Sequence, residues 1–328
     1  MLYAGYPLES GIRLRSLRPA AADAKHPAIR IAIQAACRGR QETPEPLWRH
    51  QWLEADGSLS LRVARWHQAA PDGNAMHLLQ APEQCDFLVD PSAGWIGVDA
   101  CSGLAENTLE HLLLDQALPR LLAGRGHLVV HASVIRIGSR AVAFVGRSGR
   151  GKSTLAALFQ RRGYPALCDD CALFDHHDRQ ASVTPSYPGL RLYSDSIEHA
   201  LEWADESGPV SQYSDKQRVI ALQQAAELQA PQPLAAIYLL DDPPPGGTGL
   251  AIEPVTPAAA CMALVEHGFR LDPTRREETT RQLRLASAVA EACPTFLLRY
   301  PRDFDRQDAL VEQLLRHHQR LPHTPATP

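Results

Sequence analysis

The order of apolar and polar positions divides the chain into two parts. Up to about residue 124, short apolar runs alternate with turn residues, as at Ala75–Leu79, Cys85–Val89 and Gly94–Val98. Runs of this length predict a meandering, β-rich section. It ends at Asn107–Leu118, where apolar residues recur at helical spacing. The pattern therefore predicts an α+β section over residues 1–124 that ends in a helix.

After residue 124 the pattern changes to alternating strands and helices. Apolar runs at 128–137 and 141–145 predict two strands, and the segment 154–162 predicts the helix that follows them. This alternation predicts an α/β sheet over residues 125–320, with a ligand site at the carboxyl ends of its strands. The same pattern predicts further strands at Ala166–Cys168, Gly189–Tyr193, Val219–Leu222, Ala235–Leu240 and Thr295–Arg299, and further helices at Glu277–Ala292 and Gln307–His317.

Two segments show neither the helical nor the strand spacing of apolar residues. The run Asp241–Gly247 contains three consecutive prolines followed by glycines, and prolines cannot donate to a strand ladder. We expect a surface turn there. Residues 321–328 contain three more prolines and few apolar side chains, and we expect a disordered tail.

The composition is that of an ordinary globular protein. A chain of 328 residues with 45% hydrophobic content can fill the core of one large domain or two modest ones. Its net charge of −4 gives no basic footprint for nucleic acid, and no apolar run approaches the ~20 residues that cross a bilayer. The segment Met1–Pro7 lacks the features of a signal peptide. We therefore expect a cytoplasmic protein that binds neither nucleic acid nor membrane, and that can be an oligomer.

The segment Gly146–Ser153 fits the P-loop pattern G-x-x-x-x-G-K-[ST], in which a glycine-rich loop encloses the phosphates of a nucleotide. Its glycines keep backbone N–H groups open to a phosphate, and the helix that follows directs its positive end to the same place. Lys152 then reaches the β- and γ-phosphates, and Ser153 offers a hydroxyl to Mg²⁺. The residues predicted to bind the nucleotide are Gly146, Ser148, Gly149, Arg150, Gly151, Lys152, Ser153 and Thr154.

The rarity of lysine supports this interpretation. Only three of the 33 Lys and Arg residues are lysines, at positions 25, 152 and 216. A lysine at the motif position is therefore hard to ascribe to background composition. The context also fits, because an apolar strand over 140–145 enters the loop and a helix leaves it. A glycine-rich turn without a ligand is the weaker interpretation.

An acidic pair and a histidine could supply the other half of a site. Asp169 and Asp170 follow the apolar run at 166–168, so they would lie beside the loop, one to hold Mg²⁺ and one to accept a hydroxyl proton. The alternative is a solvated turn. A hairpin through residues 137–140 would bring His131 to the same end of the sheet. A lone histidine can equally be structural.

Seven cysteines, an odd number in a chain of this size, do not indicate a disulfide framework. Cys168 and Cys171 form a C-x-x-C pair at the end of an apolar strand. A zinc site would need a second pair of ligands, and a redox pair would open a helix. The pattern favours two small side chains that pack beside the acids.

Several of these segments together resemble a known family. They are His131–Val134, Gly146–Thr154, Arg161–Pro165 and Asp169-Asp170. They resemble the kinase core of the HPr kinase/phosphorylase family, and most of all its shorter relatives in peptide-modification gene clusters, which include the lasso-peptide kinases. The resemblance covers about 40 residues closely, and more weakly the rest of the C-terminal half.

The resemblance implies a P-loop fold akin to phosphoenolpyruvate carboxykinase, and phosphorylation of a serine hydroxyl that depends on ATP and Mg²⁺. It implies that one aspartate is the base, and we expect Asp169 in this role, with Asp170 and Ser153 facing the metal. It makes His131 a partner of the base and Arg191 a candidate to neutralise charge in the transition state. In the polar loop that follows, Lys216 and Arg218 are candidates to contact the γ-phosphate. For Arg218, an ordinary solvated charge is the alternative.

The chain also departs from the bifunctional members of the family. Gly189 stands where their signature has a glutamate before the arginine strand, and residues 1–124 do not resemble their N-terminal domain. We therefore expect a kinase for a peptide or small protein with a serine acceptor, such as a lasso-peptide precursor. The alternatives are a regulatory or assembly protein that binds ATP without transferring phosphate, and a small-molecule kinase.

Overall fold

The structure is a computed structural model. It describes residues 1–17, 19, 26–33, 48–53, 56–66, 76–200, 206–220, 230–243, 249–301, 303 and 306–321. Nearly all of the predicted tail, the proline segment 244–247 and the last two residues of the strand predicted at 219–222 lie outside the described residues. The described part is a mixed α/β protein with many strands and few helices, as expected at that level.

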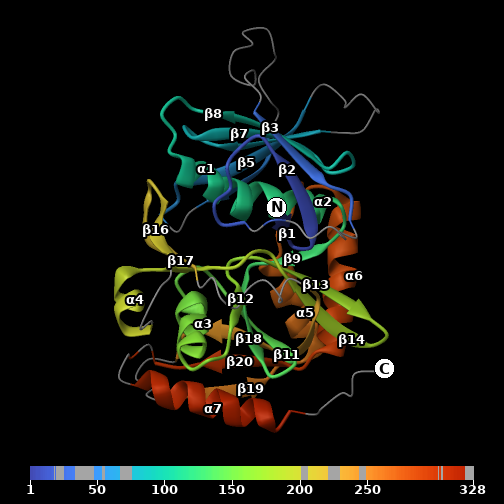
Figure 1. Ribbon diagram of the computed structural model, residues 1–328. Coiled ribbons are helices and arrows are strands. Elements are labelled where there is room, and N and C mark those ends of the chain that lie inside the picture. Colours follow the sequence, from blue (N-terminus) through green and yellow to red (C-terminus); the bar gives the residue numbers. More distant parts are fainter. Residues whose placement is uncertain are drawn as a thin grey trace.

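The described residues among the first hundred include an eight-stranded mixed sheet, drawn at the top of Figure 1. The strand order is β1-β2-β3-β8-β7-β6-β5-β4, and only the β2/β3 and β3/β8 pairs are parallel. The strands are β1 (Leu2–Tyr3), β2 (Tyr6–Ser10), β3 (Ile29–Ile33), β4 (Trp48–Leu53), β5 (Leu59–Arg65), β6 (His77–Ala81), β7 (Cys85–Asp90) and β8 (Trp95–Ala100).

A continuous helical segment lies between this sheet and the rest of the molecule (Figure 1). It consists of α1 (Glu106–Leu112), the π-helical turn η1 (Leu113–Ala117) and α2 (Leu118–Gly124). Leucines on several of its sides are buried in one cluster with residues from both parts, such as Phe87 and Val129. A helix that is apolar around most of its circumference must be covered on both sides, and this one is.

The second sheet has nine strands in the order β12-β10-β11-β18-β14-β13-β9, with β20 beside β18 and β19 beside β20. The strands are β9 (Leu128–Val130), β10 (Ala132–Ile137), β11 (Arg140–Val145), β12 (Ala166–Cys168), β13 (Ala172–His177), β14 (Gln180–Pro185), β18 (Gln232–Asp241), β19 (Ala251–Pro254) and β20 (Thr295–Arg299). Because β11, β18 and β20 are parallel neighbours, their carboxyl ends meet at one edge.

Helices cover both faces of this sheet. One face packs against α5 (Pro257–Glu266) and α6 (Arg276–Ala292), through a cluster that includes Leu264 and Val289. The other packs against α3 (Lys152–Arg161) and α7 (Gln307–Gln319), through a cluster that includes Leu158. A small third sheet stands beside α3 and the short helix α4 (Ser194–Ala200). Its strands, in the order β15-β17-β16, are β15 (Leu190–Leu192), β17 (Ser214–Ile220) and β16 (Glu206–Ser211).

The apolar run at 128–137 differs from its prediction as a single strand. It divides at His131 into β9, which pairs with β13, and β10, which pairs with β11 and β12. The His131 N–H donates to the carbonyl of His267, so the chain leaves one ladder and enters another at this residue. The helix predicted at 154–162 begins two residues earlier, at Lys152.

No helix in the described part of the chain is both long enough and apolar enough to cross a membrane.

His77, at the start of β6, makes the stability of the fold depend on pH. Its side chain is buried, with Nε2 3.9 Å from an oxygen of Asp272, and burial lowers its pKa from 6.5 to about 4. Between pH ~6.5 and ~4, His77 is therefore neutral in the folded protein and protonated in the unfolded chain. The free energy of unfolding falls as the pH falls through this range. The shift corresponds to roughly 3 kcal/mol of unfolding free energy over that window.

We expect the unfolding free energy of the His77→Gln variant, measured with urea at several values between pH 7 and pH 4.5, to fall less steeply than that of the wild type. The matched control is His177→Gln, because His177 is exposed. A His77→Gln slope parallel to that of the wild type would exclude this origin of the pH dependence.

Candidate active site

The loop between β11 and α3 has the geometry that its glycines permit. Gly149 and Gly151 have φ of +77° and +85°, in the left-handed region that favours glycine. A Cβ on Gly151 would lie 2.7 Å from the hydroxyl of Tyr300, and a Cβ on Gly146 would lie 3.1 Å from the carbonyl oxygen of Leu240. The strand, loop and helix therefore follow one another as the motif predicts, at the edge where the parallel strands end.

Lys152 is the first residue of α3, and its side chain folds back over the loop. Nζ donates to the carbonyl oxygens of Gly146 at 2.8 Å and Arg147 at 3.0 Å, and the residue is only 4% exposed. Burial lowers the pKa of the amine, while Asp170 and Asp169 act in the opposite direction. An ammonium held on neutral carbonyls can exchange them for the stronger charge-assisted bonds that phosphate oxygens offer.

Asp169 and Asp170 follow β12 but face different surroundings. Asp169 is 1% exposed, and one of its oxygens accepts a hydrogen bond from the hydroxyl of Ser133. The other accepts from the backbone N–H of Arg191 at 2.9 Å. Burial raises the pKa of Asp169, and the neighbouring charge of Asp170 raises it further. Both oxygens accept hydrogen bonds inside the protein, and Asp169 does not line the cavity beside the loop. The role of base expected for Asp169 stays a prediction.

Asp170 lines the cavity beside the loop. Its φ is +66°, a left-handed value that costs a residue other than glycine free energy and that often occurs at functional sites. One oxygen lies 2.7 Å from Nη2 of Arg191, and the other lies 3.7 Å from Nε2 of His131. Burial raises its pKa, but Arg191 and then His131 more than offset this, so the pKa lies below its ordinary value. Asp170 is therefore an ionised carboxylate at the cavity surface.

His131 stands where β9 gives way to β10, next to the end of β11, because Ala132 pairs with Val145. Its Nδ1 lies 2.9 Å from the backbone carbonyl oxygen of Asp170. A carbonyl can only accept, so Nδ1 carries the hydrogen and Nε2 of the neutral ring keeps a lone pair. Burial, and then Lys152, lower the pKa of His131 to about 4. The ring is therefore neutral at pH 7.

Arg191, on β15, is buried between carboxylates from the two parts of the chain. Nη2 is paired with Asp170, and Nη1 donates to Oδ2 of Asp115, which lies on η1. Asp115 also accepts from the hydroxyl of Tyr187 at 2.6 Å and lies 2.7 Å from Nδ1 of His111. Burial would lower the pKa of Arg191, but Asp115 and Asp170 raise it well above its ordinary value, so the guanidinium stays charged.

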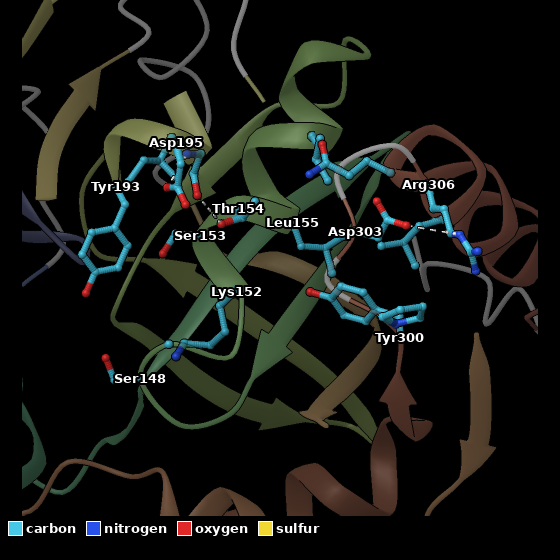
Figure 2. Close-up of a pocket in the computed structure, with 18 of the residues that line it drawn as sticks. Ser148, Lys152, Ser153, Thr154, Leu155, Tyr193, Asp195, Tyr300, Asp303 and Arg306 are labelled. Atoms are coloured by element: carbon cyan, nitrogen blue, oxygen red, sulfur yellow. Dashed lines mark hydrogen bonds and ion pairs between the residues drawn. The ribbon is translucent and has the colours of Figure 1, made fainter. Parts of the chain in front are cut away.

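These groups surround one cavity of about 500 Å³, shown in Figure 2. The charged end is formed by residues from the loop, by Asp170 and by the small third sheet. The other end carries leucines of α3 and α7 beside Tyr300, Asp303 and Arg306. The predicted site residues that line the cavity are His131, Ser148, Gly149, Gly151, Lys152, Ser153, Thr154, Asp170, Arg191 and Lys216.

Four other candidates lie outside this lining. Asp169 is behind it, and Gly146 contributes the carbonyl that holds Lys152. The side chain of Arg150 is paired with Asp242. Arg218 is directed to the N-terminal part, where it donates to Ser16 and lies 3.2 Å from Glu110. Arg218 is thus placed as a structural ion pair and not at the γ-phosphate position that its sequence context allowed.

Three residues that shape the site were not predicted from the sequence: Asp115, Tyr187 and Tyr300. Asp115 had a readable signal, because it is a single acidic residue within the apolar run Leu112–Leu118. A buried charge in such a run requires a partner. The partner is far away in sequence, so the pattern alone could not name it.

The donor set fits Mg²⁺. The Ser153 hydroxyl and the Asp170 carboxylate both line the charged end, and oxygen ligands of this type suit the ion. Within the described ranges, no group of three His, Cys, Asp or Glu residues could hold a metal ion. An ion here would therefore need phosphate oxygens and water to complete its shell, as Mg²⁺ commonly does.

Cys168 and Cys171 are buried and do not form a disulfide. The Cys171 sulfur lies 2.9 Å from the hydroxyl of Tyr3. Burial raises the pKa of Cys168 to about 12 and that of Cys171 further. Thiols of this kind are poor nucleophiles and poor ligands, which agrees with the packing interpretation of the pair.

Comparisons with known proteins give little beyond this geometry. No family model matches the chain, and no curated protein matches it. Among solved structures, the chain is similar to the Hpr(Ser) kinase/phosphatase from Coxiella burnetii, with 14% identity over 58% of this chain and 95% of that chain. The TM-score of this match is 0.31, which is too low to support an argument about function.

Proposed function

We propose that the protein is a kinase that transfers the γ-phosphoryl group of ATP, with Mg²⁺, to a serine hydroxyl of a peptide or small protein. One observation carries the proposal: a single cavity is lined both by the loop residues Lys152 and Ser153 and by the ionised carboxylate of Asp170 with neutral His131 beside it. Binding of a nucleotide needs only the loop. Transfer to a hydroxyl needs, in addition, a group that orients the hydroxyl and accepts its proton, and a carboxylate opposite the loop can supply this.

ATP fits the two ends of the cavity. Its phosphates would lie on the loop and the first turn of α3, where Lys152 exchanges the carbonyls of its own loop for phosphate oxygens. Its base would lie at the other end, against the apolar side chains of Leu155, Leu158 and Leu310. Apolar walls with a few convergent polar groups are usual for such ligands.

The residues then divide the work of the transfer. The serine oxygen forms a bond to the γ-phosphorus as the bond from phosphorus to the β-phosphate oxygen breaks, and ADP leaves with that electron pair. We assign the serine proton to Asp170, whose charge Arg191 holds in place. Mg²⁺, held by Ser153, Asp170 and the phosphates, would neutralise charge on the phosphate oxygens. Asp169 becomes a support that orients Ser133 and the backbone of Arg191.

The acceptor is the part that rests on the sequence resemblance. The motifs around His131, Lys152 and Asp170 resemble those of kinases in peptide-modification clusters, so a lasso-peptide precursor with a serine is the acceptor we propose. Tyr193 and Lys216 both line the cavity, and Tyr193 is 49% exposed, so we propose this side of the cavity for the peptide.

The test incubates the full-length protein with ATP and Mg²⁺ and one of three acceptors: a precursor-like peptide ending in serine, the same peptide ending in alanine, or small alcohols. We expect mass spectrometry to find one added phosphoryl group on the serine peptide only. ATP binding without transfer to any acceptor would favour the regulatory alternative, and transfer only to small alcohols would favour a small-molecule kinase.

A further inference from the structure

Arg191 joins the two parts of the protein at the proposed active site. Its guanidinium is 3% exposed and lies between Asp170, which follows β12, and Asp115, which belongs to the helical segment before residue 124. Asp115 is buried to the same degree and is absent from the cavity wall. Asp115 therefore does not contact a substrate in the cavity. It contacts Arg191, which in turn contacts Asp170.

A buried guanidinium needs a counter-ion at every stage of a reaction. During the proposed transfer, Asp170 gives part of its charge to a metal or takes up a proton, and its attraction for Arg191 then falls. Asp115 keeps two donors besides Arg191: the Tyr187 hydroxyl donates to one of its oxygens, and Nδ1 of His111 lies 2.7 Å from the other. Arg191 and then His111 offset the cost of its burial, so its pKa stays below the ordinary value. Asp115 is thus the partner that can hold Arg191 in place when Asp170 is engaged elsewhere.

The local backbone agrees with a functional role. Asp115 is the central residue of the five-residue π-helical turn η1, and such turns inside α-helices are frequent at functional sites. The two leucines that precede it, Leu113 and Leu114, are fully buried between the sheets. The turn therefore places a buried carboxylate next to apolar side chains, and that carboxylate is paired with Arg191.

We propose that Asp115 is a positioning residue, which fixes Arg191 against Asp170 so that residues 1–124 complete the active site of the second part. The expected loss of activity when Asp115 is replaced rests on the proposed kinase function. The expected movement of Arg191 does not.

The experiment compares Asp115→Asn and Asp115→Ala with Tyr187→Phe, which removes a hydrogen bond from the other oxygen of Asp115 but keeps its charge. We expect kcat per folded molecule to fall about tenfold for Asp115→Asn and about a hundredfold for Asp115→Ala, with the KM for ATP changed less than about threefold. Tyr187→Phe should lower kcat less than Asp115→Asn does, because the charge that faces Arg191 stays. If Asp115→Ala does not fold, Asp115→Asn decides, since it keeps the shape of the side chain.

Two results would overturn the proposal. One is unchanged kcat per folded molecule in both Asp115 variants of an active enzyme, which would leave Asp115 a structural role only. The other is a crystal structure of the Asp115→Ala variant, or of Asp115→Asn if the alanine variant does not fold, with the Arg191 guanidinium still against Asp170. The structure is determined without ATP. An inactive wild type would therefore count against the proposed function, while the position of Arg191 would still decide the role of Asp115.

Discussion

Replacing Lys152 with alanine is expected to lower kcat/KM for phosphoryl transfer by about a thousandfold, the largest effect of any single change outside the acidic pair. The amine is the only lysine in the loop, and it lies at the charged end of the cavity, 2.8 Å from a loop carbonyl that a phosphate oxygen can replace. Because its interactions with the phosphates would exist before and during transfer, ATP affinity should fall as well. Transfer kinetics and calorimetric titration with ATP measure the two effects separately.

The matched control is Arg147→Ala. Arg147 belongs to the same loop and has the same charge, but its side chain is 74% exposed and paired with Glu266. We expect this variant to keep the activity and stability of the wild type. If Lys152→Ala transferred phosphate at the rate of Arg147→Ala, the loop would not be a phosphate site.

Part of this site could be predicted from the sequence because its chemistry is carried by contiguous residues. The loop residues Gly149, Gly151 and Lys152 occupy one short segment, and the backbone geometry that they need is a local property of glycine. The position of His131 also followed from a local feature, since the hairpin between β10 and β11 returns the chain to the end of the loop strand.

Which of Asp169 and Asp170 lines the cavity could not be predicted in this way. Adjacent residues of the same type carry no signal for which of them faces a cavity. The structure decides it through the left-handed backbone at Asp170 and through two donors on Asp169, the Ser133 hydroxyl and the Arg191 backbone. Both donors come from other strands, so they exist only in the folded protein.

The contribution of Asp115 was also beyond the sequence pattern. Periodicity predicted a helix over 107–118, but it could not show that this helix lies between two sheets or that a π-helical turn falls at its centre. Likewise Arg191 on β15 and Arg218 on β17 are neighbours in the backbone ladder. The side chain of Arg191 is buried at the cavity, whereas that of Arg218 forms an ion pair with Glu110. Long-range packing separates two arginines that look alike in the sequence.

The second large effect is expected for Asp170→Asn, which should lower kcat by about a thousandfold and change the stability of the fold little. An asparagine keeps the size of the side chain but cannot take the serine proton, and it is a weaker ligand for Mg²⁺. Because Arg191 keeps Asp115 as a counter-ion, the variant does not leave that guanidinium unpaired. Single-turnover transfer and thermal unfolding, with Asp175→Asn as an exposed control, measure both expectations.

Asp169→Asn should behave differently, and the contrast between the two variants tests which aspartate acts on the substrate. If the amide oxygen introduced by this substitution keeps the hydrogen bond from the backbone N–H of Arg191, the NH₂ group faces the Ser133 hydroxyl, which now donates to the carboxylate. The hydroxyl would have to turn and accept, and its own hydrogen would lose its buried acceptor. An unsatisfied buried donor costs about 1–3 kcal/mol, so the expected loss is mainly in stability. If instead Asp169→Asn stayed fully folded and lost transfer, while Asp170→Asn kept it, the base would be Asp169 and the geometry around Asp170 would serve another purpose.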